Sequence, residues 1–471
     1  MTRFQFGDFE LDAATGRLTH AGTPVTVPAR HLDVLAALLA RAGEVVSKDA
    51  LVEAAWRDVA VTDNSLEQAI SSLRRALATA GASIETVPRQ GYRFAGEVRR
   101  MAPRASDDAL DALIAPYRAF VEGRAALESL SVDRVVDAAR AFDTMLAASP
   151  ENAAAHVGMA TANAMRFEMT RADPEPALDA LAAAANHARE SCRLDPQYGE
   201  AWATLGFVLD RTGANVDAMA ALSRAVSLEP DNWRHHLRLA AVSWGEARLR
   251  AARRTLALLP GCPLAHWLAA TVHVARQGLD QAERELVAGC AAVAVGGSDA
   301  RFSGVALEWL LGLIHLSRGD AAAAREHFDR ELAAEHGGHL YARECCANVW
   351  YAIGAIRWRE GDRAGAHEAF AQALQRVKGH GLAAIGLTLS ASRPREVQDT
   401  GPRSSGVEIA MAKAVALTSA GQRAEAAAVV DAALAAAPPG NGGWILPVEP
   451  LLQVSGPEWE PVLARLGSRA A

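Results

Sequence analysis

The feature that most limits the fold of this 471-residue chain is a repeated pattern of small and aromatic residues in its C-terminal three quarters. Pro196 and Pro230 end successive units at the spacing expected for two-helix repeats. Small residues let the two helices of a unit approach, an aromatic residue fills the space between them, and proline ends the second helix. The clearest copy contains Trp202, Leu205, Gly206, Gly213, Ala218, Ala225 and Pro230.

Other stretches keep the small-then-aromatic part of this pattern, which resembles the tetratricopeptide repeat. They predict an all-α solenoid of roughly seven or eight helical pairs, with no strand. The unit between Pro150 and Pro196 is overlong, and Thr170–Pro176 is its expected insertion. The further copies are Ala138, Phe142 and Pro150; Gly312, Gly319, Ala324 and Phe328; Trp350, Gly354, Gly361, Ala366, Phe370 and Ala373; and, more weakly, Ala414, Gly421, Ala426, Ala433 and Pro438.

The composition agrees with helices that pack through small side chains, because 50% of residues are hydrophobic but only 6% are aromatic. The net charge of −7 and the pI near 6.1 argue against indiscriminate binding to nucleic acid or anionic membranes. Residues 1–100 have equal numbers of acids and bases, so the whole net charge lies in the remainder. If the N-terminal region binds DNA, it does so through a few placed cations.

Targeting and redox signals point to a cytoplasmic protein. The chain starts in sequence that is typical of a folded domain, with no apolar stretch like that of a signal peptide. No uncharged apolar run approaches the roughly 20 residues that span a bilayer. The cysteines are odd in number and show no disulfide framework; they are Cys192, Cys262, Cys290, Cys345 and Cys346.

The first hundred residues predict a small α+β domain. Residues 3–27 alternate apolar and polar positions around turns at Thr15-Gly16 and Ala21-Gly22, which favours short antiparallel strands. A first helix is expected from Pro28 to Ala42, with Gly43 as its stop. Its buried face would hold Leu32, Leu35, Leu38 and Leu39.

Two further helices and a hairpin complete this domain. Ser47 is expected to cap a helix from Lys48 to about Ala55, with Asp49 in its first turn. A third helix should run from about Ser65 to Ala78, capped by Asp63 or Asn64. The stretch from Glu85 to Phe94 reads as two strands around a turn that holds Arg89, and it closes the domain near Val98.

The third helix has two distinct faces. Leu66, Ile70, Leu73 and Leu77 form an apolar stripe that would pack on the first two helices. The opposite stripe carries residue types that hydrogen-bond base edges, with Gln suited to adenine and Arg to guanine. An ordinary solvated face is the alternative, but the preceding helix pair and the following Arg89 turn favour a winged helix-turn-helix. The outer stripe consists of Asn64, Gln68, Ser71, Ser72 and Arg75, with Arg74 to the side where a phosphate would be reachable.

The run from Phe4 to Val98 resembles the effector domain of OmpR/PhoB-type transcriptional regulators. The matching pieces are Phe6–Asp12, Gly43–Lys48, Trp56, Ile70–Leu77 and Glu85–Phe94. The resemblance implies that Arg89 enters a minor groove and that Tyr92 and Phe94 pack the wing on the core. It also implies that Asn64, Ser65, Gln68, Ser71 and Ser72 face the major groove, and that Trp56, Arg74, Arg75 and Arg93 lie near phosphates.

Two departures from the family's pattern reduce the positive charge. Ser71 and Ser72 stand where many relatives have Arg or Lys, and Gln90 occupies a wing site that is often Arg. Fewer cations release fewer counterions, so the salt dependence of binding should be shallow. One copy is therefore expected to bind DNA weakly, and useful affinity should need two copies on adjacent half-sites.

A winged helix followed by a repeat array is similar to CadC/ToxR-like and HilA-like one-component regulators, here without the membrane segment of the CadC-like members. A phospho-acceptor receiver domain is not seen either, so regulation is expected through the array. Self-association is favoured over a separate protein partner. The loop Arg57–Thr62 is where the family would contact RNA polymerase, which favours activation. The candidate groove residues of the array are Arg166, Arg211, Arg248 and Arg357, which the sequence does not distinguish from ordinary surface charge.

No pattern in the sequence supports catalysis, a cofactor or a metal. His336 and His339 precede the pair Cys345-Cys346, but adjacent cysteines on a helix diverge by about 100° and no second ligand pair follows. Phosphate-binding loops and hydrolase or zinc-protease motifs are not found. The chain is expected not to be an enzyme.

These observations predict a multidomain protein: an N-terminal α+β winged helix-turn-helix and an all-α tetratricopeptide-repeat solenoid. The expected limits are residues 1–98 for the winged helix, 99–115 for a linker, 116–440 for the array and 441–471 for a C-terminal capping segment. The alternative is an interaction scaffold whose winged helix binds a protein. Arg74, Arg75 and Arg89 favour DNA, since a protein-docking winged helix would tend to have an apolar outer face.

Overall fold

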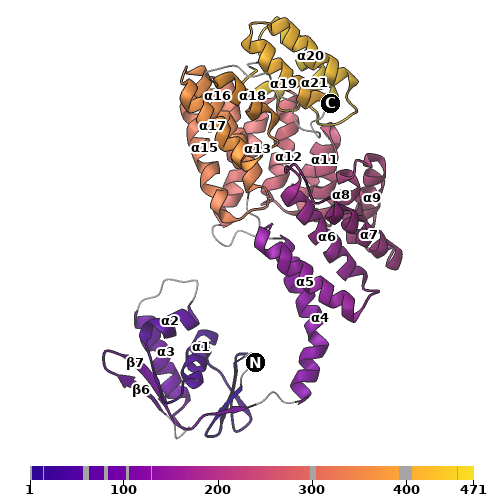
Figure 1. Ribbon diagram of the computed structural model, residues 1–471. Helices are drawn as coiled ribbons and strands as arrows, with labels where there is room; N and C mark the ends of the chain where they lie inside the picture. Colours follow the sequence, from indigo (N-terminus) through magenta and orange to yellow (C-terminus); the bar gives the residue numbers. More distant parts are fainter. Residues whose placement is uncertain are drawn as a thin grey trace. The chain divides into compact units, whose positions relative to one another are not determined.

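The computed structural model describes residues 3–13, 15–56, 63–78, 83–101, 105–128, 130–296, 304–391, 406–452 and 454–471. The chain divides into two compact units, residues 1–115 and residues 116–471, which we call the winged-helix unit and the array. Both are shown in Figure 1.

The winged-helix unit begins with an antiparallel sheet in the order β4-β3-β2-β1-β8. Alternating residues of the first three strands, among them Phe4, Phe9 and Leu18, are buried on one face. This confirms the expected strands, and the chain reverses at Ala21 and Gly22 with positive φ angles of 47° and 80°. The strands are β1 (Arg3–Phe6), β2 (Phe9–Asp12), β3 (Arg17–His20), β4 (Thr23–Val25) and β8 (Arg99–Met101).

Three helices cover this core: α1 (Ala29–Ala40), α2 (Lys48–Ala55) and α3 (Asp63–Ala76). The four leucines expected on the inner face of α1 are buried. The Ser47 hydroxyl accepts a hydrogen bond from the Ala50 N–H at 3.3 Å, which confirms the predicted cap of α2. Helix α3 begins two residues earlier than the predicted Ser65, and the side chains of Asp63 and Asn64, the predicted caps, lie outside the described part of the structure.

The hairpin is formed by β6 (Ser83–Val87) and β7 (Gly91–Ala95), and β7 also pairs with the short strand β5 (Val45–Val46). Gly91 is required at this crossing because a Cβ there would lie 2.0 Å from the Val46 carbonyl oxygen. Tyr92 and Phe94 are buried, as expected, and the Phe94 ring meets the Phe6 ring edge-on at a centroid distance of 5.3 Å. The wing is thereby fixed to the first sheet.

Residues 99–115, expected as a linker, contain more regular structure than a linker requires. Arg99–Met101 form β8, which pairs with β1 in the register Phe4↔Arg100. Helix α4 (Ala105–Glu128) then begins well before Pro116. Strand β8 fills the free edge of β1, so the sheet continues beyond Val98. The limits of the domains otherwise stay a prediction.

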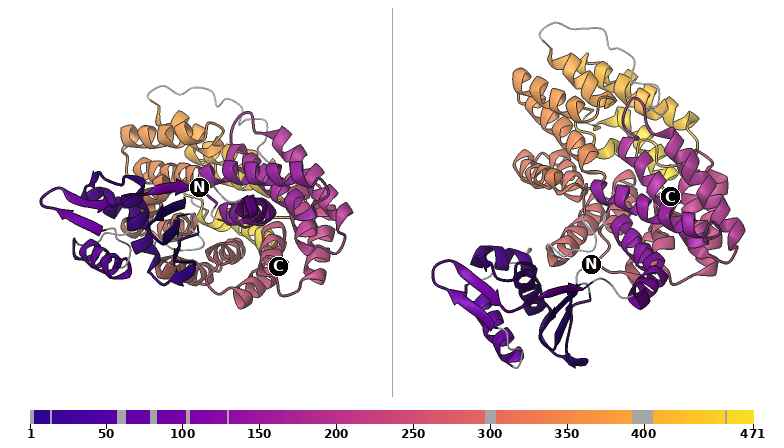
Figure 2. Two further views of the ribbon diagram at one scale, coloured as in Figure 1. Left: turned by 90° about the horizontal axis from the view of Figure 1, so that it is seen from below. Right: turned by 60° about the horizontal axis from the view of Figure 1, so that its bottom comes forward.

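The array is built from consecutive helices that pack as antiparallel neighbours (Figures 1 and 2). Within the described ranges the most extensive contacts join α6 to α7, α8 to α9, α10 to α11, α12 to α13, α14 to α15, α16 to α17 and α19 to α20. These are seven pairs, and α4 also packs on α5 through Phe120 and Phe142, which agrees with the expected seven or eight. The helices are α5 (Val132–Ala148), α6 (Ala153–Thr170), α7 (Leu178–Leu194), α8 (Gly199–Arg211), α9 (Asn215–Leu228), α10 (Trp233–Val242), α11 (Gly245–Leu258), α12 (Pro263–Ala275), α13 (Leu279–Gly296), α14 (Leu307–Ser317), α15 (Ala321–Ala333), α16 (Ala342–Arg359), α17 (Arg363–Arg376), α18 (Gly381–Ser390), α19 (Gly406–Ser419), α20 (Arg423–Ala436) and α21 (Glu460–Arg469).

Glycine and phenylalanine set the close approach of these helices. The Phe328 ring of α15 lies against Gly312 of α14, where an added Cβ would come within 2.4 Å of the ring. The Phe370 ring of α17 packs in the same way on Gly354 of α16, at 2.5 Å. Because no larger residue fits there, the structure confirms the small-then-aromatic interpretation of the repeats.

Two sets of contacts join parts of the array that are far apart in sequence. The Leu340 N–H donates to the Leu130 carbonyl oxygen at 2.7 Å, which joins the segment before α16 to the segment before α5. The second contact joins the middle of the array to its last residues, because the Glu246 N–H of α11 donates to the carbonyl oxygen of Ala471 at 3.1 Å. The array therefore curves enough for its early and late helices to meet.

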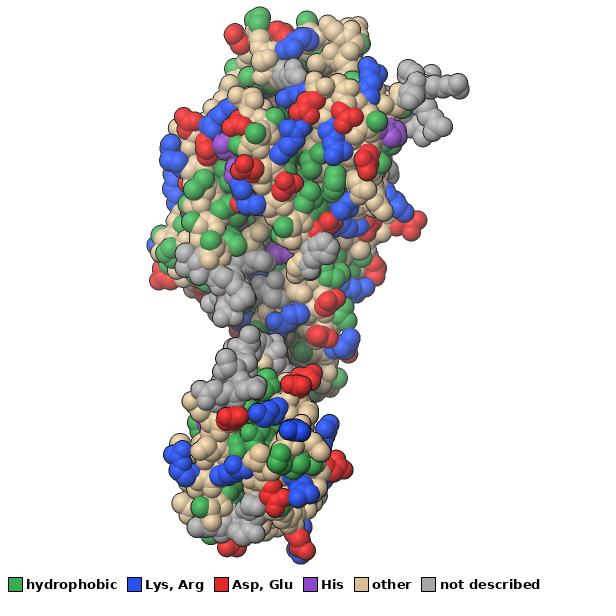
Figure 3. Space-filling model, turned by 90° about the vertical axis from the view of Figure 1, so that its left-hand side faces the viewer, with side chains coloured by type: hydrophobic (Ala, Val, Ile, Leu, Met, Phe, Trp, Pro, Cys, Tyr) green, Lys and Arg blue, Asp and Glu red, His purple; other side chains and the backbone are tan. Residues whose placement is uncertain are grey.

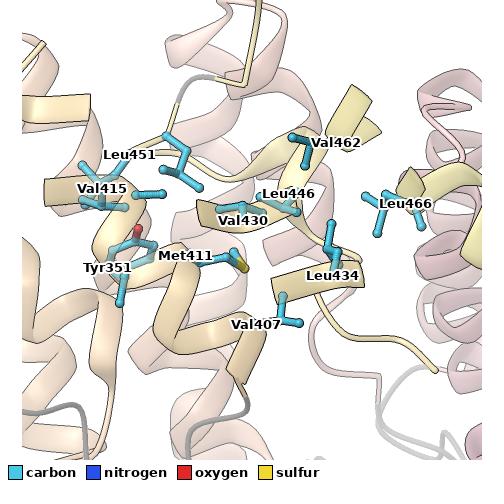
Figure 4. Packing of buried hydrophobic residues seen from close by; sticks show 14 of the residues in the cluster. Tyr351, Val407, Met411, Val415, Val430, Leu434, Leu446, Leu451, Val462 and Leu466 are labelled. Atoms are coloured by element: carbon cyan, nitrogen blue, oxygen red, sulfur yellow. The ribbon is translucent and has the colours of Figure 1, made fainter. Parts of the chain in front are cut away.

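The C-terminal segment packs on the last helical pair. Trp459 is fully buried in the same apolar cluster as Val462 and Leu466 of α21. Figure 4 shows that cluster, which also takes in Val430 and Leu434 of α20. None of the helices in the described ranges is long and apolar enough to cross a membrane.

Candidate nucleic-acid interface

Helix α3 presents one fully buried and one polar face. Leu66, Ala69 and Leu73 have no exposed surface and anchor the helix in the core. On the other face Gln68, Ser71 and Arg75 are exposed, while Ser65 and Ser72 are half-buried. Asn64 lies in the first turn of α3, but its side chain is outside the described part of the structure. The helix can therefore offer short polar side chains to a groove without losing its packing.

Arg74 connects α3 to the wing. Its Nε donates to the Ile84 carbonyl oxygen at 2.7 Å, and its Nη2 donates to Thr86 Oγ1 at 2.8 Å. Both acceptors lie on β6, so the guanidinium fixes the angle between helix and hairpin. Three of its five N–H groups are not used in these bonds, so a phosphate contact stays compatible with the geometry. Sequence reasoning missed this tether because the partners lie on another element.

Arg93 is also engaged within the hairpin. It stands directly opposite Glu85 in the β6–β7 register, and its Nη2 lies 2.7 Å from Glu85 Oε2. Both side chains are less than half exposed. This cross-strand pair offsets the charge of Arg93. The sequence contained the signal, since the two residues flank the turn symmetrically.

Arg89 stands at the tip of the wing. The Gln90 N–H donates to the Val87 carbonyl oxygen at 3.1 Å and closes a turn with Pro88 and Arg89 at its centre. Arg89 has φ = +64°, the left-handed conformation that this position of a type II turn requires. The side chain is exposed, so the turn projects a cation away from the domain.

The remaining predicted contacts are less accessible. Trp56, expected near phosphates, is 8% exposed and belongs to the apolar core at the end of α2. The Lys48 ammonium on α2 lies 3.2 Å from Glu67 Oε1 on α3, a pair that sequence reasoning missed. The expected polymerase-contact loop, Arg57–Thr62, lies outside the described residues.

Few cations are thus available on this surface. Among the described residues no ion pair or hydrogen bond involves the exposed side chains of Arg75 and Arg89. The other arginines of helix and wing, Arg74 and Arg93, are held by protein acceptors. A surface with two well-presented cations depends on shape and polar contacts for its selectivity.

The arginines suggested for the groove of the array have structural partners. Arg248 is 5% exposed and donates to the Ala240, Ala241 and Ser243 carbonyl oxygens, so it is a buried charge and not a surface one. Burial lowers the pKa of its guanidinium to about 10. The remaining three also have partners within the array: Arg166 pairs with Asn163, Arg211 with Glu168, and Arg357 with the Gly365 carbonyl oxygen.

The residues considered for a metal do not assemble into a site. Cys345 and Cys346 are buried on α16, and His339 lies just before that helix. Burial lowers the pKa of His339 to about 4. No group of three or more His, Cys, Asp or Glu residues in the described ranges is arranged to hold a metal ion.

Comparison with known proteins supports the assignment of the first unit. Residues 22–94 match the family described as "Transcriptional regulatory protein, C terminal". That range includes α1, α2, α3 and the hairpin. The winged-helix unit contains an OmpR/PhoB-type domain.

The relatives share this domain. Transcriptional regulator HilA of Salmonella typhimurium is 39% identical over 105 residues, which cover 22% of this chain and 19% of HilA. Transcriptional activator CadC of Escherichia coli is 30% identical over 92 residues, which cover 19% of this chain and 18% of CadC. The solved DNA-binding domain of E. coli CadC is 27% identical over 21% of this chain and 98% of its own, with a TM-score of 0.20. The chain spans about a fifth of the length of the curated relatives it matches.

Proposed function

We propose that this chain is a sequence-specific DNA-binding transcriptional regulator. In this proposal α3 lies in the major groove, Gln68, Ser71 and Ser72 face the bases together with Asn64 and Ser65, and Arg89 reaches the flanking minor groove. Trp56, Arg74, Arg75 and Arg93 would lie nearest the phosphates. The observation that carries it is the pairing of a polar helix face with a projecting Arg89 turn, fixed to each other by Arg74.

The relatives support this direction. HilA is named a transcriptional regulator and CadC a transcriptional activator, and both share the winged-helix range with this chain. Activation through RNA polymerase is the expected outcome. Over the face of the larger unit in Figure 3, acidic and basic side chains are interspersed, so that face offers no continuous basic surface to a phosphate backbone. We assign DNA contact to the winged-helix unit because the family match lies in residues 22–94.

The array would control the regulator by bringing two copies together or by binding a protein partner. On the helix and wing of each copy, Arg75 and Arg89 are the exposed arginines among the described residues that no protein acceptor holds, so their electrostatic contribution to DNA binding is modest. A second copy on an adjacent half-site would supply the missing affinity. Stacked helical repeats present extended surfaces that suit such association.

Replacement of Arg89 tests the proposal. Arg89→Gly removes the side chain but keeps a residue that adopts φ = +64° without strain, which Ala would not. Chromatin immunoprecipitation with sequencing should show loss of occupancy at genomic sites, together with changed target transcripts. Arg17→Ala, an exposed arginine on β3 away from the hairpin, is the matched control.

If Arg89→Gly left the occupancy of genomic sites and the target transcripts unchanged, the proposed contact between the wing and DNA would be rejected. If the protein then retained its protein partners, the scaffold alternative would take its place.

A further inference from the structure

A cavity of about 250 Å³ lies within the array, between α4, α6, α8, α10 and α12. Leu340 and Tyr341, which precede α16, complete its wall. Most of the wall is apolar, with Phe120, Leu127, Val157, Phe207, Leu237 and Leu264 among the lining side chains. An apolar cavity of about 150 Å³ holds benzene, so this one has room for roughly ten non-hydrogen atoms.

One part of the wall is strongly charged. Glu200, with a side chain 11% exposed, lies between two guanidinium groups: Arg124 Nη2 is 3.3 Å from its Oε2, and Arg238 Nη2 is 3.8 Å from its Oε1. Arg238 Nη1 also donates to Thr204 Oγ1 at 2.9 Å. Arg234 stands beside them on the same wall. Two guanidinium groups thus share one carboxylate, which leaves this end of the cavity positive.

The other carboxylate on the wall does not offset this charge. Glu168 is 1% exposed and accepts from Arg211 Nε at 2.5 Å, Arg171 Nη1 at 3.0 Å and the Tyr341 hydroxyl at 3.0 Å. Its charge is already matched by its own arginines. The positive excess therefore belongs to Arg124 and Arg238, which share Glu200.

The pKa of Arg238 reflects the same imbalance. Burial lowers it from its ordinary value, Glu200 raises it, and the neighbouring Arg234 and Arg124 lower it further. Burial also raises the pKa of Tyr198, on the cavity wall, to about 12, so its hydroxyl keeps its proton and can donate a hydrogen bond. An anion placed here would relieve the repulsion among the arginines and gain donors.

We propose that this cavity binds a small organic anion with an apolar body, such as a medium-chain carboxylate. Its carboxylate lies against Arg238 and the neighbouring Arg124, and its alkyl body packs among Phe120, Leu127 and Leu237, so that the whole molecule has about ten non-hydrogen atoms. The wall joins α4–α12 to Tyr341, which is distant in sequence, so an occupant stabilises the contact between these two parts of the array.

Isothermal titration calorimetry of the full chain without DNA tests this site, and its result does not depend on the proposed DNA function. The probes are octanoate, octylamine and 1-octanol, which share an alkyl chain and differ in head-group charge. Octanoate should bind with one-to-one stoichiometry and quench the fluorescence of Trp233 on the wall. Its affinity should exceed that of 1-octanol about tenfold or more, and octylamine should bind least. Tightest binding of octylamine, equal binding of all three, or no binding of octanoate would overturn the proposal.

Two substitutions that should change the octanoate affinity in opposite directions make the test more specific. Arg238→Met keeps the length of the side chain and should weaken octanoate binding about ten- to a hundredfold, the range for a lost charge-assisted contact. Glu200→Gln removes the competing carboxylate and should strengthen binding, and this variant decides the question if Arg238→Met does not fold. The matched control is Arg254→Met, which breaks an ion pair with Asp231 outside the cavity and should leave the affinity unchanged. Weaker octanoate binding in Glu200→Gln would reject the proposal that this end of the cavity is positive and binds an anion.

Discussion

In the winged-helix unit the buried side chains are aromatic and aliphatic, whereas the array also buries Glu168, Arg248, Glu331 and Glu449. Every buried polar or charged residue recorded in the described ranges belongs to the array. In the winged-helix unit, by contrast, Arg75 and Arg89 lie on the surface. The winged-helix unit keeps its charged side chains at or near its surface, whereas the array also buries several of them inside its fold.

The buried carboxylates of the array lie where its elements change direction. Glu331 of α15 accepts from the Ala306 and Trp309 N–H groups at 2.7 and 3.1 Å, so it holds the start of α14. Glu449 accepts from the Leu452 N–H at 2.6 Å and from the Tyr351 hydroxyl. Similar repeats offer similar apolar faces, so apolar packing alone does not decide which helices meet. We infer that these polar contacts specify the array's curvature.

The largest expected effects come from the aromatic residues in the two cores. Phe94→Ala in the winged-helix unit and Phe370→Ala in the array should each lower the free energy of unfolding of its own unit by about 3–5 kcal/mol, because each buried ring leaves a cavity. Calorimetric or urea unfolding of the full chain should show that each substitution moves one transition. Tyr117→Ala, at a side chain that is 73% exposed, is the control and should move neither.

If both substitutions lowered a single common transition by the same amount, the two units would form one cooperative body. The winged-helix unit and the array could then not be treated as two separately stable units.

The next largest effect is expected at Glu168. Glu168→Ala removes the buried carboxylate that accepts from Arg171, Arg211 and the Tyr341 hydroxyl. Arg171 keeps Glu344 and Arg211 keeps Asp210, so the expected loss is that of the buried hydrogen bonds, about 1–3 kcal/mol. Loss of stability in the array, measured by urea unfolding, should be accompanied by faster hydrogen exchange before α16, where Tyr341 loses an acceptor. Glu190→Ala, which breaks an exposed pair with Arg193, is the matched control and should leave the midpoint unchanged. Equal behaviour of the two variants would show that the buried cluster does not hold the array together.

The sequence predicted the local structure of both units well. The apolar stripe of α3, the Ser47 cap and the glycine–phenylalanine pairs depend on residues a few positions apart or one repeat apart, so their spacing is visible along the chain. The candidate site on α3 follows from the same periodicity, since the face opposite a buried stripe must be exposed.

The contacts that the sequence did not predict join residues across elements. The Arg74 tether to β6 and the Lys48–Glu67 pair depend on how helices and hairpin are oriented. Arg171 of the array lies 2.7 Å from Glu344, far along the chain. A charged residue has the same helical periodicity whether it meets solvent or a distant carboxylate. For that reason the sequence does not distinguish Arg248 from ordinary surface charge, and only the structure shows that it is buried.

A smaller effect is expected from two histidines of the array, the buried His339 and the half-buried His380. Burial lowers the pKa of His339 and of His380 to about 4, from 6.5. A histidine with a lowered folded-state pKa takes up protons more readily when unfolded, so stability present above pH 6.5 is lost as the pH falls towards 4. Between pH 7 and pH 5 each should cost the array about 2 kcal/mol of unfolding free energy.

Urea unfolding at a series of pH values measures this loss. His380→Asn keeps a residue able to cap α18, where the histidine Nδ1 accepts from the Ala383 N–H, and should remove its share of the acid dependence. His20→Asn in the winged-helix unit should leave the array's transition unchanged. An array equally stable at pH 7 and pH 5 would contradict the neutral state of these rings.

The smallest effects distinguish base-specific contacts from phosphate contacts on α3. Gln68→Ala should cost about 1–3 kcal/mol of binding free energy at the preferred DNA site, and little at unrelated DNA, because a glutamine contact is specific to a base. Arg75→Ala should weaken binding to all sequences similarly and lower the salt slope by about 1. Gel-shift titrations over a range of salt concentrations give both quantities.

The same titrations should be made with the full chain and with a fragment ending at Met101, since β8 pairs with β1 and a fragment cut at Val98 loses an edge strand. The fragment should bind weakly and the full chain cooperatively on paired half-sites. Tight, non-cooperative binding by the fragment alone would remove the array from the DNA-binding step and leave the surface of the winged-helix unit sufficient by itself.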